Sequence, residues 1–256
     1  MIHSTAIISD LANIAENVEI GPYSIIGDHV DIGAGTKIES HVVVKSNTSI
    51  GESNHIFQFA SIGDDPQDKK YNGQLTTLTI GDRNTIREYC TINRGTIEDS
   101  GNTIVGNDNW IMAYCHIAHD CIVGNKVIMA NGTTLAGHVH LGDWVICGGH
   151  TGIHQFCKVG EHAFLGMYSS INRDVPAYIL VSGKPAEPKG INTEGLKRRG
   201  FSKDQVRNIK EAYRLIYRKG LKLSEAIKQI ESALDNQKEL LPLYESLIAS
   251  DRGIVR

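Results

Sequence analysis

A six-residue repeat of aliphatic side chains runs through the first two thirds of the chain. Stepping by six from Ile2 meets a valine or isoleucine at every step up to Ile62. The register resumes at Ile80, slips by one residue after Ile92 and continues to Ile171. A period of six fits neither an amphipathic helix nor one alternating strand. It is typical of a coil of short parallel strands, in which each hexad supplies one inward side chain and three hexads close one coil.

The repeat predicts a long, narrow core. We count 26 inward positions, and each buried aliphatic side chain contributes about 1.5–3 kcal/mol. The chain has 26 glycines and only 6% aromatic residues, which suits many tight turns around small side chains. We therefore expect a solenoid whose backbone pairing runs between neighbouring coils.

The repeat is interrupted twice. Near residues 64–79 the inward positions would be Asp68 and Gln74, so we expect an external loop there. The one-residue slip falls across residues 95–102. A tolerated surface insertion is the simplest interpretation of both, but long loops often carry function. The first loop is therefore also a candidate for a functional role.

After Ile171 the period fades and helical patterns begin. Ser202 and Gln205 predict a capping box at the start of one helix, which Gly220 ends. A second helix is expected from Ser224 and a third over residues 239–249. We expect a mainly β chain, with a β-helix over residues 1–188 and a C-terminal helical domain over residues 189–256. The helices would cover the open end of the coil.

Composition excludes several classes of protein. The net charge of -3 argues against nucleic-acid binding, which needs a basic surface. No apolar run approaches the roughly 18 residues of a membrane span, and the N-terminus lacks the pattern of a signal peptide. Five cysteines without a CxxC pair indicate reduced thiols. These features predict a cytoplasmic protein.

The 11 histidines cluster, and the coil length predicts which of them meet. Residues that stand three hexads apart stack between adjacent coils, so one column joins the turns of three coils. His119 is expected at a turn or on the outer face, two residues after the inward Ile117. His116 is close to this column in the sequence. The column itself contains His119, Asp120, Gly137, His138, His154 and Gln155.

Two chemistries suit this column. A neutral histidine oriented by Asp120 can act as a general base, and the Gly137 N–H can stabilise an oxyanion. Alternatively, three histidines can bind zinc, as in carbonic anhydrases built on hexapeptide repeats, whose ligands come from neighbouring chains. A lone histidine would be no more than a surface residue. The segment NTEGLKRRGF is either a solvated charge run or a phosphate site, because paired arginines offer donor forks to a diphosphate.

Seven stretches together carry a resemblance to one family. They are IFQFASIG, QDKKY, IREYCTINRGT, HIAHDC, LAGHV, IHQFC and NTEGLKRRGF. With them the whole chain resembles the UDP-N-acetylglucosamine O-acyltransferases that begin lipid A biosynthesis. The resemblance implies a left-handed coil, a homotrimer with sites between subunits, and acyl carrier protein as the donor. It implies transfer of an (R)-3-hydroxyacyl group to the glucosamine 3-hydroxyl, with neither a metal nor another cofactor.

The resemblance also implies roles for individual residues. His119 would be the general base supported by Asp120, and the Gly137 N–H would bind the oxyanion. The sugar and the acyl hydroxyl would be held by Asp68, Lys70, His116 and His138. The nucleotide and phosphates would contact His154, Gln155, Asn192, Glu194, Arg198 and Arg199.

Met167 stands where relatives that use longer acyl chains resemble one another in carrying glycine. A methionine there would shorten the acyl groove, which predicts a shorter donor such as 3-hydroxydecanoyl. Three rival interpretations stay open: the related N-acyltransferase of the same pathway, the zinc carbonic anhydrase, and a non-catalytic binding platform.

Overall fold

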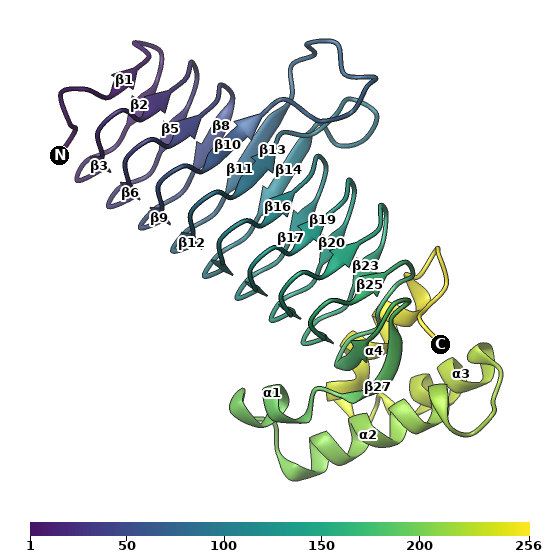
Figure 1. Ribbon diagram of the computed structural model, residues 1–256. Coiled ribbons are helices and arrows are strands. Elements are labelled where there is room, and N and C mark those ends of the chain that lie inside the picture. The colour runs from purple at the N-terminus through teal and green to yellow at the C-terminus, as the bar shows by residue number, and fades with distance from the viewer.

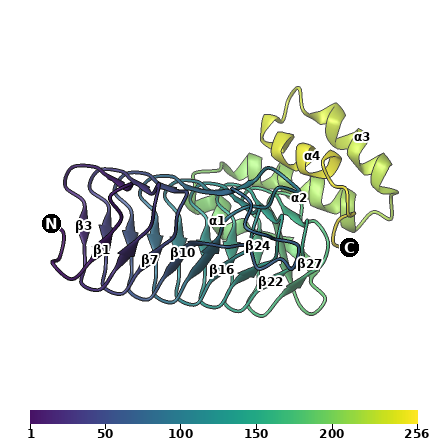
Figure 2. The ribbon, with the colours of Figure 1, turned by 90° about the horizontal axis from the view of Figure 1, so that it is seen from above.

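The computed structural model describes residues 1–256 as a triangular parallel β-helix followed by helices at one end (Figures 1 and 2). Three parallel sheets form the faces of the coil. The first sheet contains β1 (Ile7–Ile8), β4 (Ile25–Ile26), β7 (Val43–Val44), β10 (Ser61–Asp64), β13 (Thr91–Asn93), β16 (His116–Ile117), β19 (Thr134–Leu135), β22 (Gly152–Ile153) and β25 (Ser170–Ile171).

The other two sheets follow the same order along the axis. The second contains β2 (Asn13–Ile14), β5 (Asp31–Ile32), β8 (Thr48–Ile50), β11 (Thr77–Ile80), β14 (Asn102–Val105), β17 (Ile122–Val123), β20 (His140–Leu141) and β23 (Lys158–Val159). The third contains β3 (Glu19–Ile20), β6 (Lys37–Ile38), β9 (His55–Ile56), β12 (Thr85–Ile86), β15 (Trp110–Ile111), β18 (Ile128–Met129), β21 (Ile146–Cys147), β24 (Phe164–Leu165), β26 (Ile179–Ser182) and β27 (Glu187–Ile191). Only β27 runs antiparallel to its neighbour.

From Val18 onward, each hexad of the coil buries two side chains rather than the one that the repeat predicts. The predicted inward residues are all buried from Ile20 onward, whereas Ile2 is 48% exposed and Ile8 and Ile14 are partly exposed, because they lie in the first coils at the open end. The residue two positions earlier also points inward, as Val42, Cys115 and Thr133 illustrate. These second positions are small and chemically mixed, so no aliphatic period marks them.

Both interruptions are loops, and they project from the same edge of the coil (Figure 1). Ile7 pairs with Ile25 at the regular spacing of three hexads, whereas Ile62 pairs with Ile92, and Ile92 with Ile117, across longer stretches of chain. The first loop therefore inserts residues 65–76, and the second inserts residues 95–101, between strands that stay in register. The external loop expected near residues 64–79 corresponds to residues 65–76, since β10 ends at Asp64 and β11 begins at Thr77.

The tail forms α1 (Thr193–Arg198), α2 (Lys203–Tyr217), α3 (Leu223–Ala233), a 3₁₀ turn η1 (Lys238–Leu240) and α4 (Leu241–Ile248). The capping box of Ser202 and Gln205 is present. The expected start at Ser224 is wrong: α3 begins one residue earlier, and the Glu225 side chain accepts from the backbone N–H of Lys222.

The tail is bonded to the end of the coil. The Tyr178 hydroxyl donates to the Glu239 carbonyl (2.8 Å), and Lys158 pairs with Asp251 (2.7 Å). The proposed boundary between residues 188 and 189 lies within β27, which still pairs with the third sheet. No helix is long and apolar enough to cross a bilayer.

Candidate active site

The turns that leave the first sheet build one column of stacked residues. Asp120, His138 and Phe156 occupy equivalent positions, each with a left-handed backbone (φ 59°, 62° and 64°). Backbone hydrogen bonds join the turns, from the His138 N–H to the His119 carbonyl (3.0 Å) and from the Phe156 N–H to the Gly137 carbonyl (3.2 Å). The coil length therefore brings three separate sequence segments together at one corner.

His119 lies at this turn as expected, but it is buried and not on the outer face, with 6% of its surface exposed. Gly137 makes room for the ring, since a Cβ built on Gly137 would lie 2.5 Å from His119 Cε1 and 2.7 Å from Nε2. The Gly137 N–H makes no hydrogen bond within the chain. It is therefore free to donate to a ligand beside the His119 ring.

The Asp120 carboxylate orients His119. It lies 2.8 Å from His119 Nδ1 and is itself only 2% exposed. Burial alone would raise the pKa of Asp120, but hydrogen bonds from His119 and from the Thr96 hydroxyl and N–H hold this pKa below its ordinary value. An ionised Asp120 accepts from Nδ1–H, which leaves His119 Nε2 as the ring's proton acceptor.

A second histidine–aspartate pair lies beside the first. His138 Nδ1 is 2.7 Å from Asp99 Oδ2 and 3.9 Å from Asp120 Oδ2. The His138 ring meets the His119 ring edge-to-face at 5.0 Å and stacks on Phe156 at 4.3 Å. Neither ring can turn freely between these neighbours.

These residues open into a cavity of about 470 Å³. Predicted residues and unpredicted ones line it together: Asp68, Lys70, Thr96, Glu98, Asp99, His119, His138, Gln155 and Phe156. The sequence did not identify Thr96, Glu98 and Asp99, because an irregular loop has no period from which to place them. Phe156 stands one full coil after His138, so the spacing contained a signal for it.

The first loop reaches the cavity from a buried anchor. The Arg94 guanidinium donates to the Gly63 carbonyl (2.5 Å) and pairs with Asp65, and the Asn93 side chain donates to the Asp65 carbonyl. Within the loop, the Lys70 N–H donates to the Asp68 carboxylate (3.0 Å). The INRGT stretch thus fixes the base of the loop that carries Asp68 and Lys70.

Two predicted histidines lie outside the lining of this cavity. His116 is on β16, with Nδ1 2.7 Å from the Thr91 hydroxyl. Burial and the proximity of His119 lower the pKa of His116. His154 is exposed, and its Nδ1 is 3.1 Å from the Gln155 carbonyl.

All four predicted tail residues line a second cavity, of about 360 Å³, at a different corner of the coil. This corner joins the second and third sheets. Outward side chains of β18, β21 and β24 form an apolar wall, and α1 supplies polar groups. The lining comprises Lys126, Ile128, Trp144, Ile146, Phe164, Asn192, Glu194, Gly195, Arg198 and Arg199.

The four tail residues differ in their freedom to meet a ligand. The Asn192 side chain caps α1 and donates to the His162 carbonyl (2.9 Å). Arg199 donates to the Trp144 carbonyl (2.8 Å), lies 2.9 Å from His162 Nδ1 and covers the Trp144 ring at 5.0 Å. Burial, and then the charge of Arg199, lower the pKa of His162 to about 4. The Arg198 side chain makes no hydrogen bond or ion pair within the chain.

Lys126, Trp144 and His162 form the column of this second corner. Each has a left-handed backbone, and the Lys126 ammonium lies 4.5 Å from the centre of the Trp144 ring. They follow one another at intervals of one full coil, so the same arithmetic that relates His119 to Gly137 contained a signal for them.

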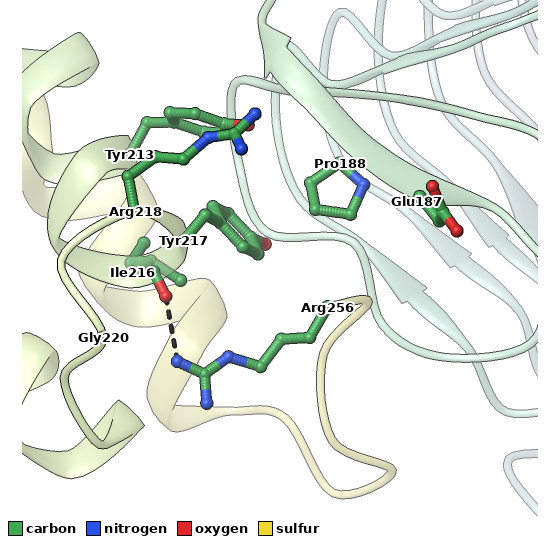
Figure 3. Close-up of a pocket in the computed structure, with 8 residues that line it drawn as sticks. All are labelled: Glu187, Pro188, Tyr213, Ile216, Tyr217, Arg218, Gly220 and Arg256. Carbon is green, nitrogen blue, oxygen red and sulfur yellow. Dashed lines mark hydrogen bonds between the residues drawn. The ribbon is translucent and has the colours of Figure 1, made fainter.

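Met167 lies apart from both cavities. It follows β24 at the corner between the third and first sheets and is 65% exposed, with its Cγ 4.0 Å from a Cβ built on Gly149. A third cavity, of about 450 Å³, lies between β27 and α2 and holds none of the predicted residues (Figure 3). Arg256 crosses it and donates to the Ile216 carbonyl (2.9 Å).

The ligand atoms of His119, Asp120 and His138 all lie within 4.8 Å of one another, close enough to share a metal ion. Nδ1 of each of the two rings is already hydrogen-bonded to a carboxylate. The cluster therefore suits either proton transfer or metal binding by its geometry alone.

Comparison with known proteins decides the family. Residues 174–255 match the second domain of UDP-N-acetylglucosamine O-acyltransferase, and residues 11–46 and 102–137 match the bacterial transferase hexapeptide repeat. The acyl-[acyl-carrier-protein]--UDP-N-acetylglucosamine O-acyltransferase of Thiobacillus denitrificans is 55% identical over 255 residues, with 100% of this chain and 99% of the relative covered.

Solved structures agree over the whole chain. The UDP-N-acetylglucosamine acyltransferase of Francisella novicida has a TM-score of 0.98 at 47% identity, covering 100% of this chain and 94% of that one. The O-acyltransferase of Moraxella catarrhalis also has a TM-score of 0.98, at 48% identity, covering 100% and 99%. The coil is left-handed, and this chain belongs to the UDP-N-acetylglucosamine O-acyltransferase family of acyltransferases.

Proposed function

We propose that this chain transfers an (R)-3-hydroxyacyl group from acyl carrier protein to the 3-hydroxyl of UDP-N-acetylglucosamine, the first step of lipid A biosynthesis. The buried His119–Asp120 pair beside the unbonded Gly137 N–H is the observation that carries this proposal. It unites a general base with an oxyanion donor, which acyl transfer from a thioester requires. The printed names of the relatives support the same reaction.

In the proposed mechanism, His119 Nε2 takes the proton of the sugar 3-hydroxyl. The alkoxide oxygen attacks the thioester carbon, and the Gly137 N–H donates to the resulting oxyanion. When this intermediate collapses, the carbon–sulfur bond breaks and the thiolate takes the proton from the His119 imidazolium. Asp120 stabilises that imidazolium by accepting from Nδ1–H (2.8 Å).

The remaining predicted residues divide between the two cavities. Asp68, Lys70 and His138 line the cavity of His119, and His116 lies near it, which supports a role in holding the sugar and the acyl hydroxyl. Gln155 also lines this cavity, and its carbonyl lies 3.1 Å from His154 Nδ1. The nucleotide and its phosphates would bind Asn192, Glu194, Arg198 and Arg199 in the second cavity, where the Arg198 side chain makes no hydrogen bond or ion pair within the chain.

We infer a homotrimer from this division. The two cavities lie at different corners of one coil, so a single UDP-sugar that contacts both must pass between two chains. Packing three coils side by side would set the His119 corner of one chain against the tail corner of the next. The five cysteines, all unpaired and buried, fit a protein of the reducing cytoplasm.

We also propose that Met167 limits the acyl chain to a shorter donor such as 3-hydroxydecanoyl. Its exposed side chain projects from the outer face of the coil, where a neighbouring chain would form the second wall of an acyl groove. The test compares carrier proteins loaded with 10- and 14-carbon hydroxyacyl groups. Replacement of Met167 by glycine should raise the rate with the longer donor, and a parent enzyme that already prefers it contradicts the proposal.

Zinc-dependent carbonic anhydrase is the candidate that the His119, Asp120 and His138 geometry admits. Metal analysis of protein purified without a chelator, together with a carbon dioxide hydration assay, separates it from acyl transfer. The names of the relatives favour acyl transfer over this alternative and over the N-acyltransferase.

The decisive experiment is a transfer assay with UDP-N-acetylglucosamine and hydroxyacyl carrier protein. His119→Ala should lower kcat by about 10²–10⁴-fold, the usual contribution of a positioned base. Binding of the UDP-sugar, measured by calorimetry, should stay within about twofold of the parent. A variant that binds the sugar and keeps full activity would exclude His119 as the base and would favour a non-catalytic binding platform.

A further inference from the structure

The second loop, residues 95–101, contacts the ionisable groups of both histidine–aspartate pairs. We propose that it is a positioning element of the active site, in which Thr96 orients Asp120 and Asp99 orients His138. The kinetic part of this inference rests on the proposed transfer reaction. The structural part rests on the hydrogen bonds alone.

Thr96 holds the Asp120 carboxylate through three hydrogen bonds. Its N–H donates to both carboxylate oxygens (2.9 and 3.1 Å), and its hydroxyl donates to Oδ2 (2.6 Å). Oδ2 is also the atom that faces His119 Nδ1. Rotation of the carboxylate would therefore break the bonds to Thr96 and the bond to His119 at the same time.

Asp99 determines the hydrogen-bonding role that His138 offers to a ligand. An ionised carboxylate only accepts hydrogen bonds, so the Asp99 contact at 2.7 Å selects the tautomer with a proton on Nδ1. Nε2 is then an acceptor, suited to a substrate hydroxyl. An amide in place of Asp99 can donate to Nδ1 and so allow the opposite tautomer, with Nε2–H as a donor.

Backbone hydrogen bonds within the second loop hold Thr96 and Asp99 in one closed turn. The Gly101 N–H donates to the Thr96 carbonyl (3.0 Å), and the Asp99 N–H donates to the same oxygen (3.3 Å). At the start of the loop, a Cβ on Gly95 would lie 2.5 Å from the Gly101 carbonyl carbon. The inserted residues therefore form a closed turn that presents Thr96 and Asp99 together.

The Thr96 contact is tested with Thr96→Val, which keeps the shape and the N–H but removes the hydroxyl. We expect kcat to fall about tenfold, with KM for the UDP-sugar unchanged, because the hydrogen bond to the charged Asp120 is lost. Thr96→Ser should restore most of the rate. Thr133→Val is the matched control, since it removes a buried hydroxyl that bonds only to backbone carbonyls.

The Asp99 contact is tested with Asp99→Asn. We expect KM for the UDP-sugar to rise about fivefold to tenfold, because His138 Nε2 no longer presents only an acceptor. Nitrogen-15 spectra of the imidazole rings, recorded at pH 8, should show His138 moving from the Nδ1–H form towards the Nε2–H form. Asp108→Asn, which removes a carboxylate from a surface ion pair with Arg83, is the control.

The outcomes separate this inference from the proposed reaction. If Thr96→Val keeps the parent kcat, or if the His138 tautomer is the same in Asp99→Asn and its control, the loop does not position these groups. If the tautomer changes in Asp99→Asn but the parent enzyme transfers no acyl group, the contact between Asp99 and His138 stands and the proposed reaction fails. A fall in thermal stability alone, with kcat, KM and the tautomers unchanged, also overturns the inference.

Discussion

The two cavities of this chain are built in different ways from the same coil. At the His119 corner, hydrogen bonds pair His119 with Asp120 and His138 with Asp99, and two inserted loops line the space. At the Trp144 corner the coil is uninterrupted, and the polar groups come from Lys126 of the coil and from the tail. The Arg198 side chain at this corner makes no hydrogen bond or ion pair within the chain.

The two corners serve different needs. The first holds reacting groups in fixed orientations, and the second attracts an anion by its charge. A proton-transfer site needs fixed rings and carboxylates, and the second loop provides hydrogen bonds that fix them. A site for a flexible anion needs charge with room to move, and a side chain on a short helix provides that. We therefore expect changes at the first corner to act on kcat and changes at the second to act on KM or on folding.

The largest effect is expected from Gly137→Ala. The new methyl group would lie 2.5 Å from His119 Cε1, so the ring must turn away from Asp120. We expect kcat to fall about a thousandfold, within the range for loss of a general base. Steady-state kinetics and a thermal melt would measure this, with the melting temperature near that of the parent.

Gly152→Ala is the matched control for that change. A Cβ at Gly152, on β22 of the first sheet, meets nothing within 4 Å. If both alanine variants are equally active, the space over Gly137 does not determine the position of His119, and the contrast between the corners loses its main support.

The next largest effect is expected at the second corner, where His162 makes the free energy of unfolding depend on pH. The pKa of His162 is lowered from 6.5 to about 4, chiefly by burial. The unfolded chain takes up a proton near pH 6.5 while the folded chain does not, so stability falls as the pH drops from 6.5 towards 4. The loss is about 3 kcal/mol. Urea unfolding at pH 7 and pH 4.5 should show a smaller difference for His162→Gln than for the parent.

The smallest effect is expected from Arg198→Ala. Loss of one exposed cation should raise KM for the UDP-sugar about tenfold while kcat stays within about twofold. High salt should reduce the difference, because the attraction to phosphate is screened. Arg207→Ala, which removes a cation paired with Asp204 on α2, should change neither constant. An equal fall of kcat and kcat/KM in Arg198→Ala would place this residue with the reacting groups instead.

The repeat predicted most of the fold because burial imposes it directly. An inward position needs an aliphatic side chain, so Ile20 to Ile171 show their role in the sequence. The second inward positions hold valine, alanine, leucine, cysteine, serine, threonine or asparagine, and this mixture has no apolar period. The α3 helix begins one residue before the expected Ser224 because the Glu225 side chain, and not a serine cap, closes its first turn.

The site was predictable where it follows the coil and unpredictable where it does not. His119, Gly137 and Gln155 share a column because three hexads make one turn of the solenoid. Trp144 and Lys126 follow the same spacing, but no feature of the sequence indicated a function for them. Thr96 and Asp99 depend on the shape of an irregular loop, and no spacing rule relates them to Asp120 or His138.

The uncovered first coil has a consequence for motion. Each coil is bonded only to its neighbours, so opening can begin at the end where Ile2, Ile8 and Ile14 are not fully buried and proceed one coil at a time. The tail closes the other end. Amide hydrogen exchange should therefore decrease along the axis from the N-terminus, and the catalytic coils should keep their order while the first coils open and close.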